Sequence, residues 1–348
     1  MIPTVSLGPG YPVPRIILGA WQLSVGHTEA ELDREDSFAT WDRALDRGLD
    51  TFDCADIYTG VEALIGGYVR RRRRAGATIP RVHTKFVPDL AVLPTIDRDY
   101  VARIIDRSLA RLGVERLDLV QFHWWDYRIP GYLDVMGWLA DLARDGKIRH
   151  LGLTNFDTLR THELVASGVP IATTQVQYSL LDQRPARTLA ATAEPAGVRL
   201  LCYGALAGGF LSERWLGAPE PPAWENRSLV KYRLIIEDLG GWDRFQAVLT
   251  ALAAVARRHD TSIAAVALRW VLDRPGVAAA IVGTRHRRHF ESIESAFRVC
   301  LTDGDRAAIG SATGGDPGPP GDVYDAERVP GGRHAAIMRY HLNARAPD

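Results

Sequence analysis

The sequence predicts a single (β/α)8 TIM barrel of the α/β class. Eight short runs rich in Val, Ile, Leu and Phe recur along the chain, and several lack alternation, which is typical of parallel strands buried on both faces. Amphipathic helical stretches separate these runs, and a length of 348 residues suits one barrel. The rival prediction is a doubly wound sheet with a second domain. Its G-x-G-x-x-G turn is missing after the first strand, where the chain reads LGAWQLSVG.

The predicted strands and helices alternate in chain order. The strands are 15–20, 49–53, 82–86, 117–123, 148–154, 171–176, 198–203 and 278–283. The helices include 38–47, 100–112, 131–144, 157–167, 242–258 and 262–273. The helix at 100–112 has the clearest pattern, because its apolar side chains fall on one face. Asp97 is its predicted N-cap, and Gly113 is its predicted end.

Three segments fall outside the repeat. The opening residues, with Gly8, Gly10 and several prolines between short apolar runs, predict a β-hairpin over the barrel floor. Residues 212–241 and 313–348 are predicted to be extended βα loops or a tail, and such insertions usually shape the pocket of a barrel. The predicted organisation is one barrel domain, residues 1–312, followed by a C-terminal tail that packs on or near the barrel mouth.

Composition argues against several kinds of partner. The chain has 42 basic and 42 acidic side chains, so its formal net charge is zero, which argues against binding of nucleic acid or an anionic membrane. No run approaches ~18 apolar residues, and the N-terminus lacks a signal-peptide pattern. Three distant cysteines give neither a disulfide framework nor a metal-ligand spacing, so we predict no metal site. We expect a cytoplasmic protein that is a monomer or a small homo-oligomer.

Four chemically active side chains lie at the ends of the second, third and fourth predicted strands or just after them. Asp53 ends the second strand, and Tyr58 follows it. Lys85 ends the third strand in H-T-K-F, and His123 ends the fourth in Q-F-H-W-W. Each alone has an ordinary structural explanation, such as a turn cap or core packing. Because the C-terminal strand ends of a barrel meet at one rim, the four together predict a catalytic site.

The motifs around these residues resemble the signature of the aldo-keto reductase family. L-D-T-F-D-C-A-D-I-Y, H-T-K, Q-F-H, G-L-T-N-F and Q-V-Q-Y-S follow in the family's order over roughly residues 15–297. The resemblance implies an enzyme that moves hydride between NAD(P)H and a carbonyl compound or alcohol, with Tyr58 as the general acid. It also implies that Lys85, held by Asp53, lowers the pKa of this phenol, and that His123 orients the substrate oxygen. The alternative is a cofactor-binding subunit of the same fold that is regulatory or interacts with a partner and does not catalyse.

By the same resemblance, the later strand ends bind the cofactor. Thr154, Asn155 and Gln175 match the residues that contact the nicotinamide carboxamide, and Tyr203 matches the aromatic residue that stacks on the ring. The loops after the seventh and eighth strands are expected to hold the phosphates. Their candidate residues are Gly204, Leu206, Gly208, Gly283, Arg285 and His289, with Arg287 and Arg288 nearby. Arg285 occupies the family's G-x-R position, so NADP (NADPH) is the expected cofactor.

Aromatic side chains flank the predicted catalytic residues. Trp21 follows the first strand, and Trp124 and Trp125 follow His123. Aromatic walls beside a few polar groups suit a small-molecule substrate such as a sugar or another carbonyl compound. The same side chains equally suit packing against the tail, and the sequence leaves both interpretations open.

Overall fold

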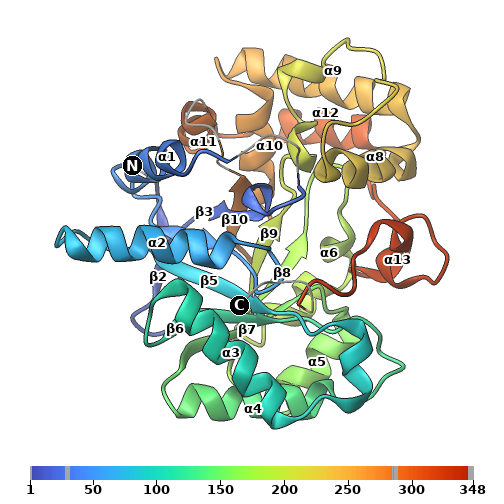
Figure 1. Ribbon diagram of the computed structural model, residues 1–348. Helices are drawn as coiled ribbons and strands as arrows, with labels where there is room; N and C mark the ends of the chain where they lie inside the picture. The colour runs from blue at the N-terminus through green and yellow to red at the C-terminus, as the bar shows by residue number, and fades with distance from the viewer. Residues whose placement is uncertain (1, 28–31, 284, 286–288, 344–348) are drawn as a thin grey trace.

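The barrel is complete in this computed structural model, which describes residues 2–27, 32–283, 285 and 289–343. Within this part of the chain, eight parallel strands close in the order β10-β3-β4-β5-β6-β7-β8-β9 (Figure 1). The strands are β3 (Ile16–Gly19), β4 (Thr51–Asp53), β5 (Arg81–Phe86), β6 (Leu117–Phe122), β7 (Ile148–Thr154), β8 (Ile171–Gln177), β9 (Arg199–Tyr203) and β10 (Val277–Gly283). The predicted (β/α)8 barrel is confirmed, and every predicted strand overlaps an observed one.

An N-terminal hairpin closes the floor of the barrel, as the sequence predicts. Its strands β1 (Thr4–Ser6) and β2 (Pro12–Pro14) pair antiparallel. Leu7, Tyr11 and Val13 of this hairpin are buried against apolar side chains from the barrel interior. Those side chains are Ile17, Leu119, Leu201, Ala278, Ala279 and Ile281. The floor is therefore a packed core, and a ligand is expected at the opposite end, where the carboxyl ends of the strands meet.

Helices surround the barrel and bury its outer face. They are α1 (Arg34–Leu45), α2 (Val61–Arg74), α3 (Arg98–Leu112), α4 (Tyr132–Arg144), α5 (Thr158–Ala166), α6 (Arg184–Arg187), α7 (Leu189–Ala193), α8 (Arg227–Leu239), α9 (Trp242–Arg258), α10 (Ile263–Leu272), α11 (Phe290–Ser295), α12 (Asp303–Thr313) and α13 (Asp325–Arg328). Short 3-10 turns are η1 (Trp21–Leu23), η2 (Leu90–Thr95), η3 (Ala207–Gly209), η4 (Glu213–Trp215) and η6 (Ala335–Ile337). Among the helices of the described chain, none has both the length and the apolar character that a membrane span requires.

Helix α3 has the caps that the sequence predicts. Asp97 Oδ1 accepts a hydrogen bond from the backbone N of Tyr100 at 2.7 Å, as an N-cap side chain does. Gly113 follows the last helical residue with a φ of 67°, a left-handed conformation that glycine adopts without a steric penalty. Local capping chemistry therefore sets both ends of this helix.

Residues 212–241 are only partly the long loop that the sequence predicts, because they contain α8. The N-cap Asn226 accepts a hydrogen bond at Oδ1 from the backbone N of Leu229 at 3.1 Å. The large buried side chains of α8 recur every three or four residues and so share one helix face. They are Leu229, Tyr232, Ile235 and Ile236. Prolines and tryptophans in the preceding stretch concealed this period.

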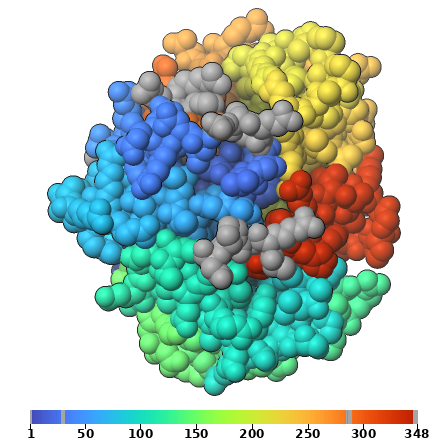
Figure 2. Space-filling view, viewed as in Figure 1, coloured from blue at the N-terminus to red at the C-terminus, as the bar shows by residue number. Residues whose placement is uncertain are grey.

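The tail after α12 lies across the barrel mouth. Its described part includes α13 and η6, and Figure 1 shows it in red. In Figure 2 the red surface lies between the gold surface that includes α8 and the cyan-to-green surface below it. Arg328 donates to two backbone carbonyls beside β6 and β7, at 2.9 and 2.8 Å. Asn343 Nδ2 donates to Asp56 Oδ2 at 3.1 Å. The tail therefore contacts the strand ends that carry the predicted site.

Candidate active site

Three strand ends place Asp53, Lys85 and His123 at the barrel mouth. β4 ends at Asp53, Lys85 is the penultimate residue of β5, and His123 follows β6. Lys85 Nζ donates to Asp53 Oδ2 at 2.6 Å and to the backbone O of Cys54 at 2.8 Å. The Lys85 and Asp53 side chains are only 6% and 5% exposed. The ion pair is therefore buried and has the hydrogen bonds that a buried charge requires.

Tyr58, in the turn after β4, lies next to this ion pair. Lys85 Nζ is 5.0 Å from the centroid of the Tyr58 ring, and the centroids of the Tyr58 and Trp21 rings are 4.9 Å apart. Burial raises the pKa of the Tyr58 phenol, the charge of Lys85 opposes this effect, and the net result is a raised pKa. The charge of Lys85 lowers the pKa of the Tyr58 phenol, as the sequence predicts. Burial raises the same pKa by more, so the predicted net lowering is not found. The resting phenol keeps its proton and is able to donate it.

The neighbours of Lys85 keep it charged. Burial by itself lowers the pKa of Lys85, but Asp53 and then Tyr58 outweigh burial, so the pKa is raised. Asp53 Oδ1 also accepts from Gln175 Nε2 at 2.6 Å and from Gln121 Nε2 at 2.9 Å. Sequence reasoning missed Gln121, although a position two residues before His123 faces the same side of a strand. The Asp53 carboxylate thus has three side-chain donors that fix its position beside Lys85.

His123 is oriented by a backbone carbonyl. Its Nδ1 lies 3.0 Å from the backbone O of Thr154, which can only accept, so Nδ1 donates this hydrogen bond. Nε2 is buried and has no hydrogen-bond partner among the described residues. Burial, followed by the charge of Arg328 in the tail, lowers the pKa of His123 to about 3. At neutral pH the imidazole is therefore uncharged, and Nε2 presents a lone pair.

The residues predicted to contact a nicotinamide carboxamide lie on adjacent strands. Thr154 of β7 pairs in register with Gln175 of β8, and Tyr203 ends β9. Tyr203 Oη donates to Asn155 Oδ1 at 2.9 Å, and Asn155 has a left-handed φ of 60°. Gln175 Nε2 donates to Asp53 Oδ1 at 2.6 Å and to Gln121 Oε1 at 2.7 Å, so only its amide oxygen is left for a ligand.

The glycine-rich loop after β9 is covered by α8. Gly204 and Gly208 have left-handed φ values of 71° and 66°. A Cβ at Gly204 would lie 2.3 Å from Tyr232 Oη, and one at Gly208 would lie 2.6 Å from Tyr232 Cδ2. Leu206 lies between the two glycines and precedes η3. The Tyr232 side chain therefore occupies the space where a Cβ of either residue would lie, so a larger residue at Gly204 or Gly208 would collide with it.

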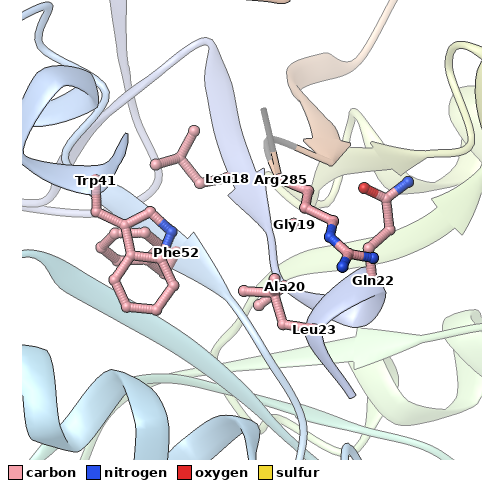
Figure 3. A pocket seen from close by; sticks show the side chains of 8 residues that line it. All are labelled: Leu18, Gly19, Ala20, Gln22, Leu23, Trp41, Phe52 and Arg285. Atoms are coloured by element: carbon pink, nitrogen blue, oxygen red, sulfur yellow. The ribbon is translucent and has the colours of Figure 1, made fainter. Parts of the chain in front are cut away.

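A small pocket lies where β3, β4 and β10 meet, and Figure 3 shows its lining. The lining residues are Leu18, Gly19, Ala20, Gln22, Leu23, Trp41, Phe52 and Arg285. The cavity volume is about 10 Å³, which is room for about one water molecule, whereas pockets for whole small-molecule ligands usually have about 300 to 1,000 Å³. A Cβ at Gly283 would lie 2.6 Å from Gln22 Oε1, so Gly283 leaves room for the Gln22 amide, which sequence reasoning missed.

The predicted phosphate-binding cluster after β10 is described in part. Arg285 lines the pocket, and His289 is exposed at the start of α11. Arg287 and Arg288 lie outside the described residues. Among the residues that the structure does describe, no group of three His, Cys, Asp or Glu side chains is arranged to hold a metal ion.

Comparison with known proteins assigns a family to this geometry. The family model described as "Aldo/keto reductase family" matches residues 15–313. The chain belongs to this family. The aldo-keto reductase YhdN of Bacillus subtilis is 27% identical over 317 residues, which cover 86% of this chain and 90% of YhdN. Flagellar radial spoke protein 5 of Chlamydomonas reinhardtii is 30% identical over 258 residues. That match covers 63% of this chain and 49% of the radial spoke protein, so the chain spans about half of that relative.

A solved structure shares the fold of this aldo-keto reductase. Glycerol dehydrogenase AKR11B4 from Gluconobacter oxydans superimposes with a TM-score of 0.73 at 24% sequence identity. The superposition covers 92% of this chain and 97% of the dehydrogenase. The family and the fold predicted from the sequence are both confirmed, and the family is one of oxidoreductases.

One of the three predicted substrate-wall tryptophans in this aldo-keto reductase is not at the mouth. Trp124 is fully buried, and its Nε1 donates to the backbone O of Asp126 at 3.0 Å and of Ile129 at 2.9 Å. The prediction that Trp124 lines a substrate site is therefore wrong. Its neighbours His123 and Trp125 point to the mouth, and the side chain between them points to the opposite face, into the core.

Trp21 and Trp125 stay at the mouth, where the tail adds two aromatic side chains. The Trp125 ring centroid is 4.4 Å from that of His123 and 5.0 Å from that of Tyr340. Tyr324 meets His123 edge-on at 5.5 Å. Sequence reasoning missed Tyr324 and Tyr340, because no local pattern indicates which aromatic residues of a tail reach a distant site. Packing against the tail is thus observed for Trp125.

Proposed function

We propose that this aldo-keto reductase is an NADP-dependent oxidoreductase that transfers hydride between the nicotinamide and a carbonyl compound or alcohol. The substrate would be an aldehyde, a ketone or a sugar, with Tyr58 as general acid or base. The observation that carries the proposal is the buried Lys85–Asp53 ion pair, with Lys85 Nζ 5.0 Å from the Tyr58 ring. When bound, the nicotinamide supplies or accepts the hydride at carbon.

The roles of the chain's own residues follow from their charges. In reduction, Tyr58 gives its proton to the substrate oxygen as that oxygen gains negative charge. Lys85 stabilises the phenolate that is left, and Asp53 keeps Lys85 charged and in place. In oxidation the phenolate takes the proton of the alcohol. In both directions the protein supplies only the proton exchanged at Tyr58 and the positive charge of Lys85.

The donors and acceptors at the strand ends suit a nicotinamide cofactor. Thr154, Asn155 and the oxygen of Gln175 offer the mixture of donors and acceptors that a carboxamide needs. Arg285 favours NADP over NAD, because a guanidinium binds the dianionic 2′-phosphate through charge-assisted hydrogen bonds. We take the barrel and tail to be one functional unit that acts in the cytoplasm as a monomer or small homo-oligomer.

Replacing Tyr58 tests the catalytic role. Nicotinamide absorbance is followed for a panel of aldehydes, ketones and sugar lactols with wild type and Tyr58→Phe. We expect kcat/KM to fall by about 10²- to 10⁴-fold in the variant, because the proton donor is lost, while NADP affinity stays the same. Equal kcat/KM values contradict the proposal. A wild type that binds NADP and turns over no compound of the panel supports the alternative, a non-catalytic subunit.

Replacing Arg285 tests the cofactor preference. In Arg285→Ala we expect the dissociation constant of NADP to rise about ten- to a hundredfold, because a charge-assisted contact to phosphate is lost. The affinity for NAD is expected to stay within about twofold, since NAD lacks the 2′-phosphate. Arg257→Ala, an exposed arginine on α9, serves as the control for loss of charge. Equal affinities of wild type for NADP and NAD contradict the preference.

A further inference from the structure

We infer that Lys231 of α8 sets the preference of this site for one oxidation state of its cofactor. Lys231 lies beside Tyr203, the proposed platform for the nicotinamide, and its positive charge favours the reduced cofactor over the oxidised one. This inference rests on the proposed function, in which the nicotinamide stacks on Tyr203. Lys231 itself exchanges neither hydride nor proton with the substrate.

Lysine is a rare residue in this chain. Only three of the 42 basic side chains are lysines, and the others are arginines. Lys85 belongs to the proposed catalytic site, and Lys147 pairs with Asp106 at 2.5 Å. The third is Lys231, which is half-buried on α8. A partly buried ammonium loses its proton far more readily than a guanidinium does, so lysine makes the charge at position 231 adjustable.

The Lys231 ammonium lies against two tyrosine rings. Its Nζ is 4.7 Å from the centroid of the Tyr203 ring and 5.7 Å from that of the Tyr232 ring, both within the range of a cation–π contact. Nζ also donates to Tyr203 Oη at 3.5 Å. Tyr203 Oη gives its own hydrogen to Asn155 Oδ1, so this oxygen accepts from Lys231. These contacts hold the ammonium beside the Tyr203 ring.

The carboxylates that influence Lys231 are paired with another cation. Arg184 binds Asp182 and Glu327, both at 2.8 Å. Among the described residues, no carboxylate forms an ion pair with Lys231. Arg184 and its two partners carry one net negative charge, so the cluster is neutral with Lys231 and negative without it. Removing the ammonium therefore favours a positively charged ligand beside Tyr203.

Lys231 is charged at neutral pH and loses its charge just above it. Burial lowers the pKa of Lys231 to about 8, although Glu327 raises this pKa, and Arg184 lowers it further. Burial also raises the pKa values of Tyr203 and Tyr232, so both phenols keep their protons at pH 9. A change from pH 7 to pH 9 therefore removes the charge of Lys231 and leaves the charges of these neighbours as they are.

The two forms of the cofactor differ in charge at the nicotinamide. The oxidised ring carries one positive charge and the reduced ring carries none, whereas the phosphates are the same in both. A nicotinamide on Tyr203 shares this side chain with the Lys231 ammonium, which repels the oxidised ring and leaves the reduced ring unaffected. Lys231 therefore raises the reduction potential of the bound cofactor, which favours hydride transfer from an alcohol to the cofactor.

The ratio of two dissociation constants tests the inference. The Kd values of NADP and NADPH are measured at pH 7, by calorimetry and by nicotinamide fluorescence, with wild type and Lys231→Met. We expect the ratio of the NADP Kd to the NADPH Kd to be about three- to thirtyfold lower in the variant. A tenfold change corresponds to about 30 mV for this two-electron couple. Lys147→Met, before the first residue of β7, is the control and should leave the ratio unchanged.

The pH dependence of this ratio separates the charge of Lys231 from its packing. Between pH 7 and pH 9 the wild-type ratio should fall toward that of Lys231→Met, because the ammonium loses its proton. Lys231→Arg, whose guanidinium stays charged, should keep the high ratio up to pH 9. Asp56, with a pKa of about 7, titrates alike in all three proteins, so the differences between them report on position 231.

The outcomes separate this inference from the proposed function. If both cofactors bind and the ratio at pH 7 is the same in wild type and Lys231→Met, the inference is overturned and the proposed function stands. A wild-type ratio that stays apart from that of Lys231→Met by the same factor at pH 9 as at pH 7 also overturns the inference. A wild type that binds neither NADP nor NADPH overturns both.

Discussion

The tail is attached to the barrel through two buried carboxyl groups that are held in opposite ways. Glu327, in the tail, accepts from Arg184 Nη1 at 2.8 Å and Nη2 at 3.1 Å, and Arg184 also binds Asp182. Asp56, on the barrel, accepts at Oδ2 from the backbone N of Val87 and from Asn343 Nδ2, both at 3.1 Å. Its Oδ1 is buried with no partner among the described residues. One anchor is an ion pair, and the other has only neutral donors.

The difference shows that the charge of the partner decides the ionisation of a buried carboxyl group. Burial opposes ionisation of Glu327, but Arg184 outweighs burial, so the pKa falls to about 2. At Asp56, burial and then Glu62 raise the pKa to about 7. The two anchors therefore respond to pH with opposite sign. Each prediction below changes one anchor and leaves the other intact.

Removing the guanidinium of the ionic anchor should have the largest effect. Arg184→Met removes the guanidinium that pairs with both buried carboxylates, Asp182 and Glu327, so we expect the free energy of unfolding at pH 7 to fall by about 3–5 kcal/mol. Urea unfolding measures this change. Arg214→Met breaks the exposed pair with Glu225 and should cost less than about 1 kcal/mol. A cost for Arg184→Met as small as that of the control contradicts the prediction.

Neutralising the other anchor should stabilise the protein at high pH. Because the pKa of Asp56 is raised from 3.8 to about 7 in the folded state, its contribution is full below pH 3.8 and is lost as pH rises through about 7. We expect Asp56→Asn to raise the free energy of unfolding at pH 8 by up to about 4 kcal/mol relative to wild type. The exposed Asp145→Asn serves as the control. A variant no more stable than wild type at pH 8 rules this out.

Acid should weaken the ionic anchor by a smaller amount. Because the pKa of Glu327 is lowered from 4.5 to about 2, its contribution is present above pH 4.5 and is lost as pH falls through about 2. That loss amounts to about 3 kcal/mol. The free energies of unfolding of wild type and Glu327→Gln, measured from pH 5 to pH 2, should therefore converge. Parallel curves would show that Glu327 is not held as an anion.

The sequence predicted the barrel and the strand-end residues well, because both follow from local pattern and from closure. Runs of apolar residues separated by amphipathic helices define the strands, and closure brings Asp53, Lys85 and His123 to one rim whatever the details of packing. The error at Trp124 arises just beyond β6, where His123 and Trp125 contact each other and the Trp124 side chain between them is buried in the core. The alternation of side chains along β6 would have identified Gln121, because it lies two residues before His123.

The parts that the sequence did not predict depend on contacts between distant segments. Tyr232 lies over Gly204 and Gly208, and nothing in the glycine-rich loop indicates that a side chain of α8 fills the space above it. Likewise, Arg328 and Tyr324 reach His123 from about 200 residues further along the chain. Composition indicated that residues 212–241 and 313–348 are additions to the barrel. It did not indicate which way their side chains point.

The pairing of β3 with β10 has a consequence for biosynthesis. Ile16 pairs with Ala280, so the first barrel strand waits for its second neighbour until almost the whole barrel has left the ribosome. Until then β3 and the most recently formed strand are both edge strands, whose unpaired backbone groups can pair with strands of other chains. The tail emerges after β10, so Arg328 and Tyr324 reach His123 last. The segment that encloses the His123 imidazole is therefore synthesised after the strands of the barrel.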